Sequence, residues 1–190
     1  MTFGWWTDAT CSGINPAWQD GGFPLTLVRE VTVNPGHVES IHISPRAEAP
    51  MEPRRDIKLL AGVGIEGDRY ATATGTYSTK PKPSRQITLI EAEAIEALAR
   101  ELGMALAPGE TRRNLVTRGV ALNHLVGRDF TVGGVRLRGH ELCEPCKYLA
   151  GLTGRPDILP GLIHRGGLRA EILEGGVIQV GDPVGPAAER

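Results

Sequence analysis

Residues 129–146 read Asp-Phe-Thr-Val-Gly-Gly-Val-Arg-Leu-Arg-Gly-His-Glu-Leu-Cys-Glu-Pro-Cys. Apolar and polar side chains alternate over 129–132 and over most of 135–142, which predicts two β-strands. Gly133 and Gly134 lie between them and are typical of a tight hairpin turn. Two cysteines follow directly where the second strand ends. This stretch therefore predicts a β-hairpin with a pair of thiols at its far end.

Short strand patterns recur along the rest of the chain. We expect further strands over residues 25–33, 37–43, 57–60, 86–90, 113–118, 168–173 and 177–180. The first two of these would pair across Asn34-Pro35-Gly36, and the last two would form a hairpin across Glu174-Gly175-Gly176. Many short strands separated by glycine-rich turns predict a mostly-β fold, a β-barrel with a few short helices.

One segment, residues 91–103, has clear helical periodicity. Its apolar side chains share one face, and Gly103 can end the helix; these side chains are Ala94, Ile95, Leu98 and Leu102. Residues 1–25 lack any strand or helix period and are expected to be an N-terminal extension. Residues 26–186 are expected to form a single domain, as a chain of 190 residues allows.

Composition excludes several classes of function. The formal net charge is −1 and no block of basic residues is present, so we do not expect nucleic-acid binding. No apolar run approaches the roughly 20 residues that cross a bilayer, so we expect no membrane span. The three cysteines (Cys11, Cys143 and Cys146) are an odd number in a mid-sized chain, which favours a reducing cytoplasm over a disulfide scaffold.

Cys146 is placed for chemistry more than for packing. Pro145 before it suits the first turn of a helix, whose free N–H groups carry partial positive charge. Lys147 adds a full positive charge next to the sulfur. Both effects favour the thiolate, which is the form that attacks, carries sulfur or binds metal. The sequence therefore predicts a reactive thiol at Cys146.

The Cys143-Glu-Pro-Cys146 pattern also permits other interpretations. The two thiols can form a redox pair, although no βαβ setting surrounds them. Together with His140 and His164 they can form a zinc site. Cys143 alone also fits the role of a small buried hydrophobe, because it continues the strand. The sequence leaves these alternatives open.

Basic residues occur in two further clusters. Arg112-Arg113-Asn114 precedes an apolar strand, and His164-Arg165-Gly-Gly-Leu-Arg169 opens another. Taken alone, Arg112-Arg113-Asn114 fits a solvated strand end slightly better than an anion site. The planar guanidinium nevertheless suits phosphate or carboxylate, so both clusters together with a thiol would form a pocket for an anionic, sulfur-linked ligand. Gly62-Val-Gly-Ile-Glu-Gly67 matches a dinucleotide-binding spacing, but no helical pattern follows it, so we interpret it as a glycine-rich turn. Asp68 and Arg69 are expected to be exposed at its end.

In this order, the motifs resemble the MOSC domain, which is named after the C-terminal domain of molybdenum cofactor sulfurases. The resemblance extends over about residues 27–185 and rests on Gly64-Ile-Glu-Gly-Asp-Arg-Tyr-Ala71, Arg112-Arg-Asn-Leu-Val-Thr117 with Gly119, Phe130–Gly133, Val135–Arg138, Leu142–Cys146 and Gly167–Asp182. It implies a small β-barrel of the MOSC type, and it maps the family's invariant cysteine onto Cys146.

The resemblance implies two alternative functions. In a molybdenum–pterin protein, Cys146 would bind the molybdenum, and the cofactor's phosphate and pterin would be held by Arg69, Arg112, Arg113, Asn114, Lys147 and Arg169. Such a protein would act as an oxidoreductase that reduces a small N-hydroxylated substrate with electrons from a donor protein. In a sulfur carrier, Cys146 would instead hold a persulfide and deliver sulfur to a metal-cofactor partner. Full sulfurases abstract that sulfur in a separate pyridoxal-phosphate domain, so this chain would need an outside sulfur donor.

Overall fold

The structure is a computed structural model that describes residues 36–187. The predicted N-terminal extension, its boundary at residue 25, and the strand expected over 25–33 with its pairing all lie outside the described residues.

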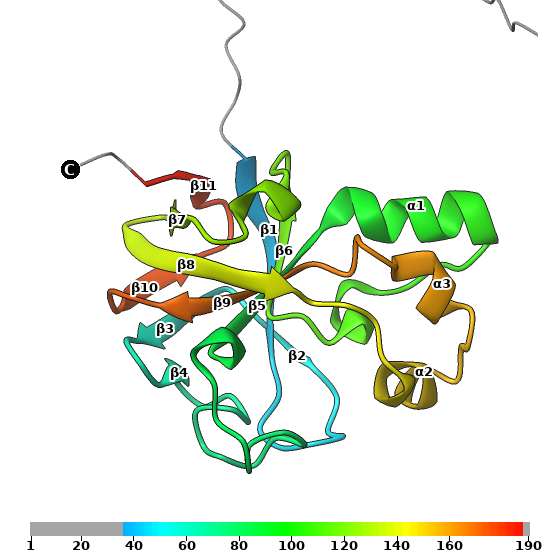
Figure 1. Ribbon diagram of the computed structural model, residues 1–190, viewed down its shortest axis with the longest axis horizontal. Helices are drawn as coiled ribbons and strands as arrows, with labels where there is room; N and C mark the ends of the chain where they lie inside the picture. The colour runs from blue at the N-terminus through cyan, green and yellow to red at the C-terminus, as the bar shows by residue number, and fades with distance from the viewer. Residues whose placement is uncertain (1–35, 188–190) are drawn as a thin grey trace, which may run out of the picture. The chain divides into compact units, whose positions relative to one another are not determined.

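Seven strands close into a barrel (Figure 1). The order around the barrel is β11-β7-β8-β9-β5-β6-β1, and β11 pairs back onto β1 to complete the circle. The pair β5–β6 is parallel, and every other neighbouring pair in the circle is antiparallel. The predicted β-barrel is thereby confirmed, with β1 (Gly36–Ile43), β5 (Ile87–Glu91), β6 (Leu115–Arg118), β7 (Asp129–Val132), β8 (Val135–Leu142), β9 (Leu168–Ile172) and β11 (Pro183–Pro186).

A three-stranded sheet adjoins the barrel, in the order β10 (Gly176–Gln179), β3 (Asp56–Leu60) and β4 (Gly64–Ile65). A further short strand, β2 (Glu52–Arg54), pairs with the end of β1. The hairpin predicted between residues 168–173 and 177–180 is wrong. Both edges of β9 are occupied by β8 and β5, so β10 has no free edge of β9 to join and pairs with β3 instead.

The hairpin predicted around Gly133-Gly134 is confirmed, because β7 and β8 pair in register from Asp129↔Arg138 to Val132↔Val135. Alternate side chains of these strands point into the barrel, where Phe130, Val132 and Leu137 are fully buried. They join a single apolar cluster formed by all seven barrel strands. Burial of each such side chain contributes about 1.5–3 kcal/mol to folding.

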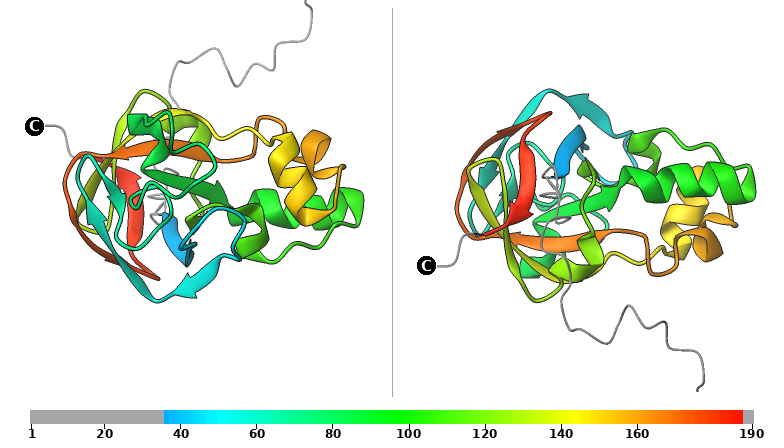
Figure 2. Two further views of the ribbon diagram at one scale, coloured as in Figure 1. Left: turned by 90° about the horizontal axis from the view of Figure 1, so that it is seen from below. Right: turned by 90° about the horizontal axis from the view of Figure 1, so that it is seen from above.

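Three helices gather on one side of the barrel (Figures 1 and 2). They are α1 (Ala92–Leu102), α2 (Lys147–Thr153) and α3 (Ile158–Leu162), and they enclose a second apolar cluster that includes Ile95, Leu98 and Leu149. None of the helices between residues 36 and 187 is both long and apolar enough to pass through a bilayer. Short 3-10 turns occupy Pro83–Arg85, Pro108–Thr111 and Leu122–Leu125.

Helix α1 agrees with its prediction in all but one side chain. Gly103 ends it in the left-handed conformation at φ 63°, which glycine adopts without strain. Ala94, Ile95 and Leu98 are buried as expected, but Leu102 is 48% exposed. Leu102 lies in the last turn, where the helix extends past the edge of the core. Helix α2 begins directly after Cys146, as Pro145 led us to expect, whereas α3 was not predicted, because five residues are too few to display a period.

Candidate functional site

Cys146 lies where the chain leaves the barrel and enters α2. Its backbone caps that helix, accepting the amide hydrogen of Ala150 at 3.1 Å, and its side chain is exposed. Cys143 is 2% exposed and packs as a small apolar side chain. Pro145 precedes the helix cap instead of standing in the first turn, but the helix expected after it is present. The structure thus separates an accessible thiol from a buried one three residues earlier.

Arg113 holds the segment that presents Cys146. This side chain is 6% exposed, and its guanidinium donates to three backbone carbonyls. Nε binds the oxygen of Gly166 at 2.8 Å, and the two terminal nitrogens bind the oxygens of Thr111 at 3.0 Å and Cys143 at 2.6 Å. Arg113 therefore connects the start of β6 to the segments on both sides of α2 and α3, and positions the cysteine.

A small cavity of about 60 Å³, which we call the Cys146 cavity, opens beside this thiol. It is lined by cationic and phenolic side chains and by the carboxylate of Glu144; the cations are Arg69, Arg85, Arg112, Arg113 and Arg169, and the phenols are Tyr70, Tyr77 and Tyr148. Four of the residues predicted to bind a cofactor thus lie around one cavity with Cys146. Arg85 and the three tyrosines were missed, because no spacing in the sequence links them to the cysteine.

Arg112 has unused hydrogen-bonding capacity. One terminal nitrogen donates to the carbonyl oxygen of Ala49, while Nε and the other terminal nitrogen are buried without any hydrogen-bond partner. Burial lowers the pKa of Arg112, and the nearby charge of Arg69 lowers it further. Unpaired buried donors on a cation are costly, and an anionic ligand would relieve that cost. Arg112 is therefore the strongest candidate for an anion contact.

Asp68 and Arg69 are buried, at 1% and 6% exposed, so the prediction that they would be exposed is wrong. The Asp68 carboxylate accepts the backbone amides of Ser44 at 3.1 Å and Tyr70 at 3.0 Å. It also accepts a terminal nitrogen of Arg69 at 3.2 Å. Two backbone amides thus stabilise the buried carboxylate of Asp68. The carboxylate in turn holds the guanidinium of Arg69 in the lining of the Cys146 cavity.

Asn114 and Lys147 were predicted to bind a cofactor, and neither lines the cavity. The Asn114 oxygen accepts the amide of Thr88 at 3.1 Å, and its nitrogen donates to the carbonyl of His42 at 3.1 Å. Both polar groups of this 3% exposed side chain are thus engaged in tying β6 to β5 and β1. Lys147 is exposed on α2. Asn114 positions its neighbours, because it directly precedes β6 and its side chain is buried in the fold.

Tyr77 lines the Cys146 cavity and interacts electrostatically with the thiol. Its ring contacts the ring of Tyr148 edge-on, with centroids 6.2 Å apart, and the guanidinium of Arg85 lies 5.5 Å from its centroid. Burial raises the pKa of Tyr77, and the charge of Cys146 raises it further. A phenol that stays protonated beside a thiolate can donate a hydrogen bond to it or a proton to a bound molecule.

The zinc alternative finds no support in the part of the chain that the structure describes. Within residues 36–187, no three His, Cys, Asp or Glu side chains gather closely enough to hold a metal ion. His140 is paired with Glu171 at 2.9 Å, and His164 with Glu144 at 3.1 Å. Cys143 and Cys146 are both free thiols.

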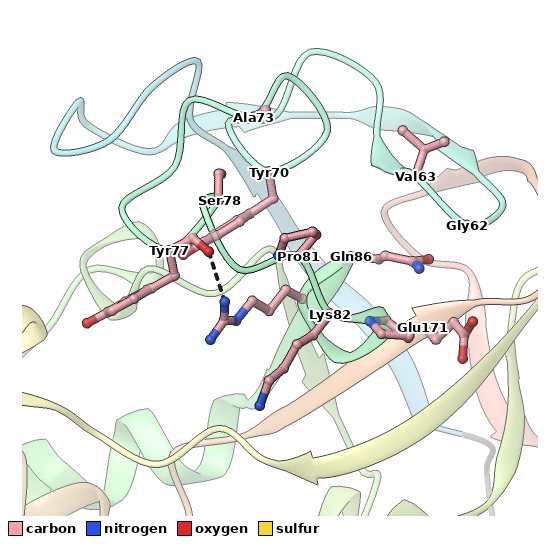
Figure 3. Close-up of a pocket in the computed structure, with 12 residues that line it drawn as sticks. Gly62, Val63, Tyr70, Ala73, Tyr77, Ser78, Pro81, Lys82, Gln86 and Glu171 are labelled. Carbon is pink, nitrogen blue, oxygen red and sulfur yellow. Dashed lines mark hydrogen bonds between the residues drawn. The ribbon is translucent and has the colours of Figure 1, made fainter.

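Two larger hollows adjoin the Cys146 cavity through different walls. The first, which we call the Tyr77 hollow, measures about 430 Å³ and shares Tyr70, Tyr77 and Arg85 with the cavity (Figure 3). The second, the Arg112 hollow, measures about 460 Å³, shares Arg112 with the cavity, and is otherwise lined by residues that include His42 and Met51. The thiol therefore lies beside enough space for a ligand much larger than its own cavity.

A family model for the MOSC domain matches residues 74–185 of the sequence. This chain belongs to the MOSC domain family. The matched segment contains Arg112, Cys146 and Arg169, and it covers most of the barrel described above. The comparison of the MOSC domain with curated proteins gives no match.

Solved structures similar to this MOSC domain share its fold. YuaD of Bacillus subtilis superposes with a TM-score of 0.66 at 17% identity, covering 80% of this chain and 94% of that one. YiiM of Geobacillus stearothermophilus has a TM-score of 0.64 at 16% identity, covering 81% and 76%. YiiM of Escherichia coli has a TM-score of 0.56 at 18% identity, covering 82% and 70%. At these identities the likeness concerns the fold alone.

Proposed function

We propose that this MOSC domain binds a molybdenum–pterin cofactor, with Cys146 as the thiolate ligand of the metal and Arg112 as the main contact to the cofactor's phosphate. The observation that carries the proposal is the pair of buried, unpartnered nitrogens on Arg112, beside a cavity that also contains an exposed thiol. A thiolate is a soft ligand for a transition metal. A guanidinium group donates hydrogen bonds to phosphate.

The size of the cavity limits which part of the cofactor it can hold. At about 60 Å³ it is much smaller than the two adjoining hollows, of about 430 and 460 Å³, so we assign to it the metal end of the cofactor alone. The rest of the cofactor would extend into the Arg112 hollow, which begins at the unpaired guanidinium. Arg69 and Arg169 would add positive charge from the cavity walls. Arg113 would act by positioning, since backbone carbonyls already engage its nitrogens.

The bound molybdenum would supply two-electron redox chemistry. The reaction we propose converts R–NHOH, two electrons and two protons into R–NH2 and water, with the electrons coming from a separate donor protein. The chain's own part is to hold the metal through Cys146, to screen the anionic cofactor with arginines, and to keep a protonated phenol at Tyr77 near the reacting group. The position of Tyr77 supports this last role, because its phenol lines the same cavity as Cys146.

The test compares Cys146→Ser with the matched control Cys143→Ala, both made in a host that synthesises the cofactor. We expect Cys146→Ser to lose molybdenum and pterin, as measured by elemental analysis and cofactor extraction, while its circular dichroism spectrum stays unchanged. Cys143→Ala should retain both, because the Cys143 side chain is buried and serves in packing. Full molybdenum loading in Cys146→Ser would overturn the proposal.

A second candidate function is persulfide carriage, and the same small cavity favours it. About 60 Å³ accommodates one extra sulfur atom on Cys146, and the exposed position leaves that atom open to a partner. In this reaction a partner's thiolate attacks the outer sulfur, the S–S bond breaks, and Cys146 departs as a thiolate. Mass spectrometry of the intact protein separates the candidates: a one-sulfur adduct on Cys146 without molybdenum supports the carrier. Either function fits the reducing cytoplasm that we propose as its compartment.

A further inference from the structure

The Tyr77 hollow has a composition suited to a small organic molecule. Its walls are the rings of Tyr70, Tyr77, Pro81 and Pro83, and its polar groups come from Lys82, Arg85, Gln86 and Glu171 (Figure 3). Its volume of about 430 Å³ is within the range of small-molecule pockets, about 300–1,000 Å³. Most of these residues belong to the single segment between β4 and β5, so the fold of that segment forms most of the hollow.

Contacts hold the aromatic walls of this hollow in place. The guanidinium of Arg69 lies 5.0 Å from the ring centroid of Tyr70, and that of Arg85 lies 5.5 Å from the centroid of Tyr77. Arg85 also donates to the carbonyl oxygens of Tyr77 and Lys80, which closes the loop between them. A wall that is rigid before binding loses little entropy when a flat ring packs against it.

The hollow carries an excess of positive charge near the thiol. Lys82 has no ion pair among residues 36–187, and Arg85 donates to neutral carbonyls, so no carboxylate neutralises either cation. Glu171 is the one acid in the lining, it is already paired with His140, and in Figure 3 it lies at the opposite end from Tyr77. Gln86 accepts the amide of Ile172 at 2.9 Å through its oxygen, which leaves its nitrogen to donate.

The Tyr77 hollow lies next to the proposed reacting centre at Cys146. Tyr70, Tyr77 and Arg85 line both the Tyr77 hollow and the Cys146 cavity, whereas the Arg112 hollow meets the cavity through Arg112. If the cofactor extends towards its phosphate contact at Arg112, the Tyr77 hollow is the adjoining space that it leaves free. A molecule seated there would have one end at Tyr77, beside the sulfur.

We propose that the Tyr77 hollow is the organic-substrate pocket of this MOSC domain, and that it selects molecules with a flat aromatic ring and an anionic group. The ring packs between the tyrosine and proline walls, and the anionic group is held by Lys82 and Arg85. This inference rests on the proposed function, which places the reacting centre at Cys146.

The experiment measures binding by NMR, with benzoate as the probe and the full chain labelled at its backbone amides. Cyclohexanecarboxylate tests the need for a flat ring, and benzamide tests the need for the charge. We expect benzoate to shift the amide signals of Val63, Lys82 and Gln86, and to bind about fivefold more tightly than either analogue. Lys82→Ala should weaken benzoate binding about fivefold, whereas the matched control Lys80→Ala, whose side chain lies outside the hollow, should not change it.

Equal binding of benzoate and cyclohexanecarboxylate would overturn the proposal, and so would the absence of any shift at these signals. Shifts confined to His42 and Met51 would place the anion in the Arg112 hollow and would overturn it as well. The same titration on Cys146→Ser separates this inference from the proposed function. The hollow should still bind benzoate in that variant, because the readout needs no cofactor, whatever the variant's molybdenum content.

Discussion

Replacing Arg113 with methionine should destabilise the protein strongly, although it removes a buried charge. Methionine keeps the unbranched apolar stem but leaves three carbonyl oxygens, those of Gly166, Thr111 and Cys143, without the donor that now binds them. A hydrogen bond from a charged group contributes about 1.5–3 kcal/mol, and a buried acceptor left unpaired costs about 1–3 kcal/mol. Methionine also removes the cost of burying the charged guanidinium, which offsets part of this loss.

The expected net loss for Arg113→Met is about 3–5 kcal/mol in the free energy of unfolding. Each kcal/mol lowers the midpoint temperature of a domain of this size by about 2–4 °C, so we expect a decrease of about 10 °C. Urea unfolding followed by far-ultraviolet circular dichroism measures the free energy. Thermal unfolding by the same signal gives the midpoint.

The neighbouring Arg112→Met variant is the matched control. It removes a guanidinium with two unpaired buried nitrogens. The Ala49 carbonyl that it releases stays within 3.0 Å of the Ser44 hydroxyl, which it shares with the carbonyl of Arg46 at 2.9 Å. We expect its unfolding free energy to stay within about 1 kcal/mol of the wild-type value. A loss below about 1 kcal/mol for Arg113→Met, or equal losses for both variants, would refute the argument that Arg113 holds the cysteine segment.

Three further predictions concern residues around the site. Gly167→Ala should cost about 3 kcal/mol or more, because φ is 106° and the new Cβ would lie 1.9 Å from the carbonyl oxygen of Leu89; a variant that melts at the wild-type temperature would contradict this. Asp68→Asn should lower the free energy of unfolding, measured in urea, by about 2–4 kcal/mol, because the new amide nitrogen would face donors such as Arg69. An unchanged urea midpoint would show that the carboxylate is dispensable. Burial lowers the pKa of His42 from its ordinary value of 6.5. As the pH falls, the histidine is therefore protonated in the unfolded chain before it is protonated in the folded protein. The free energy of unfolding should decrease as the pH falls below about 6.5. The drop in midpoint temperature between about pH 7.5 and about pH 5.5 should be smaller in His42→Gln, and an equal drop in both proteins would assign the pH dependence to other groups.

Local patterns predicted most of the strands and the main helix. The alternation over 129–142 with two glycines between its halves was sufficient for the β7–β8 hairpin, because adjacent strands pair with little entropy of loop closure. The same reasoning failed for residues 168–180. There the glycine turn suggested a hairpin, but β8 and β5 had occupied both edges of β9, and no local pattern records that competition.

The candidate site was anticipated in part. Cys146 and the arginines were identified by residue type, since thiol and guanidinium chemistry is visible in a sequence. The sequence did not show which arginine would be free to bind a ligand and which would be engaged within the protein. Arg112 and Arg113 are neighbours of the same type, yet one has unpaired nitrogens and the other is bound to three carbonyls. Tyr77 carried no signal, because its position beside Cys146 results from the folding of a proline-rich loop.

The amino-acid sequence by itself determined the periodicities that make strands and a helix, the glycines that turn the chain, and the chemical character of Cys146 and its basic companions. These are properties of a residue and its near neighbours. The tertiary structure alone decided which strand edges were free and which of two adjacent arginines kept unsatisfied donors. It also decided that a tyrosine distant in sequence would lie between a thiol and a hollow. Those outcomes depend on burial and on competition for hydrogen-bond partners, which exist only once distant segments have packed together.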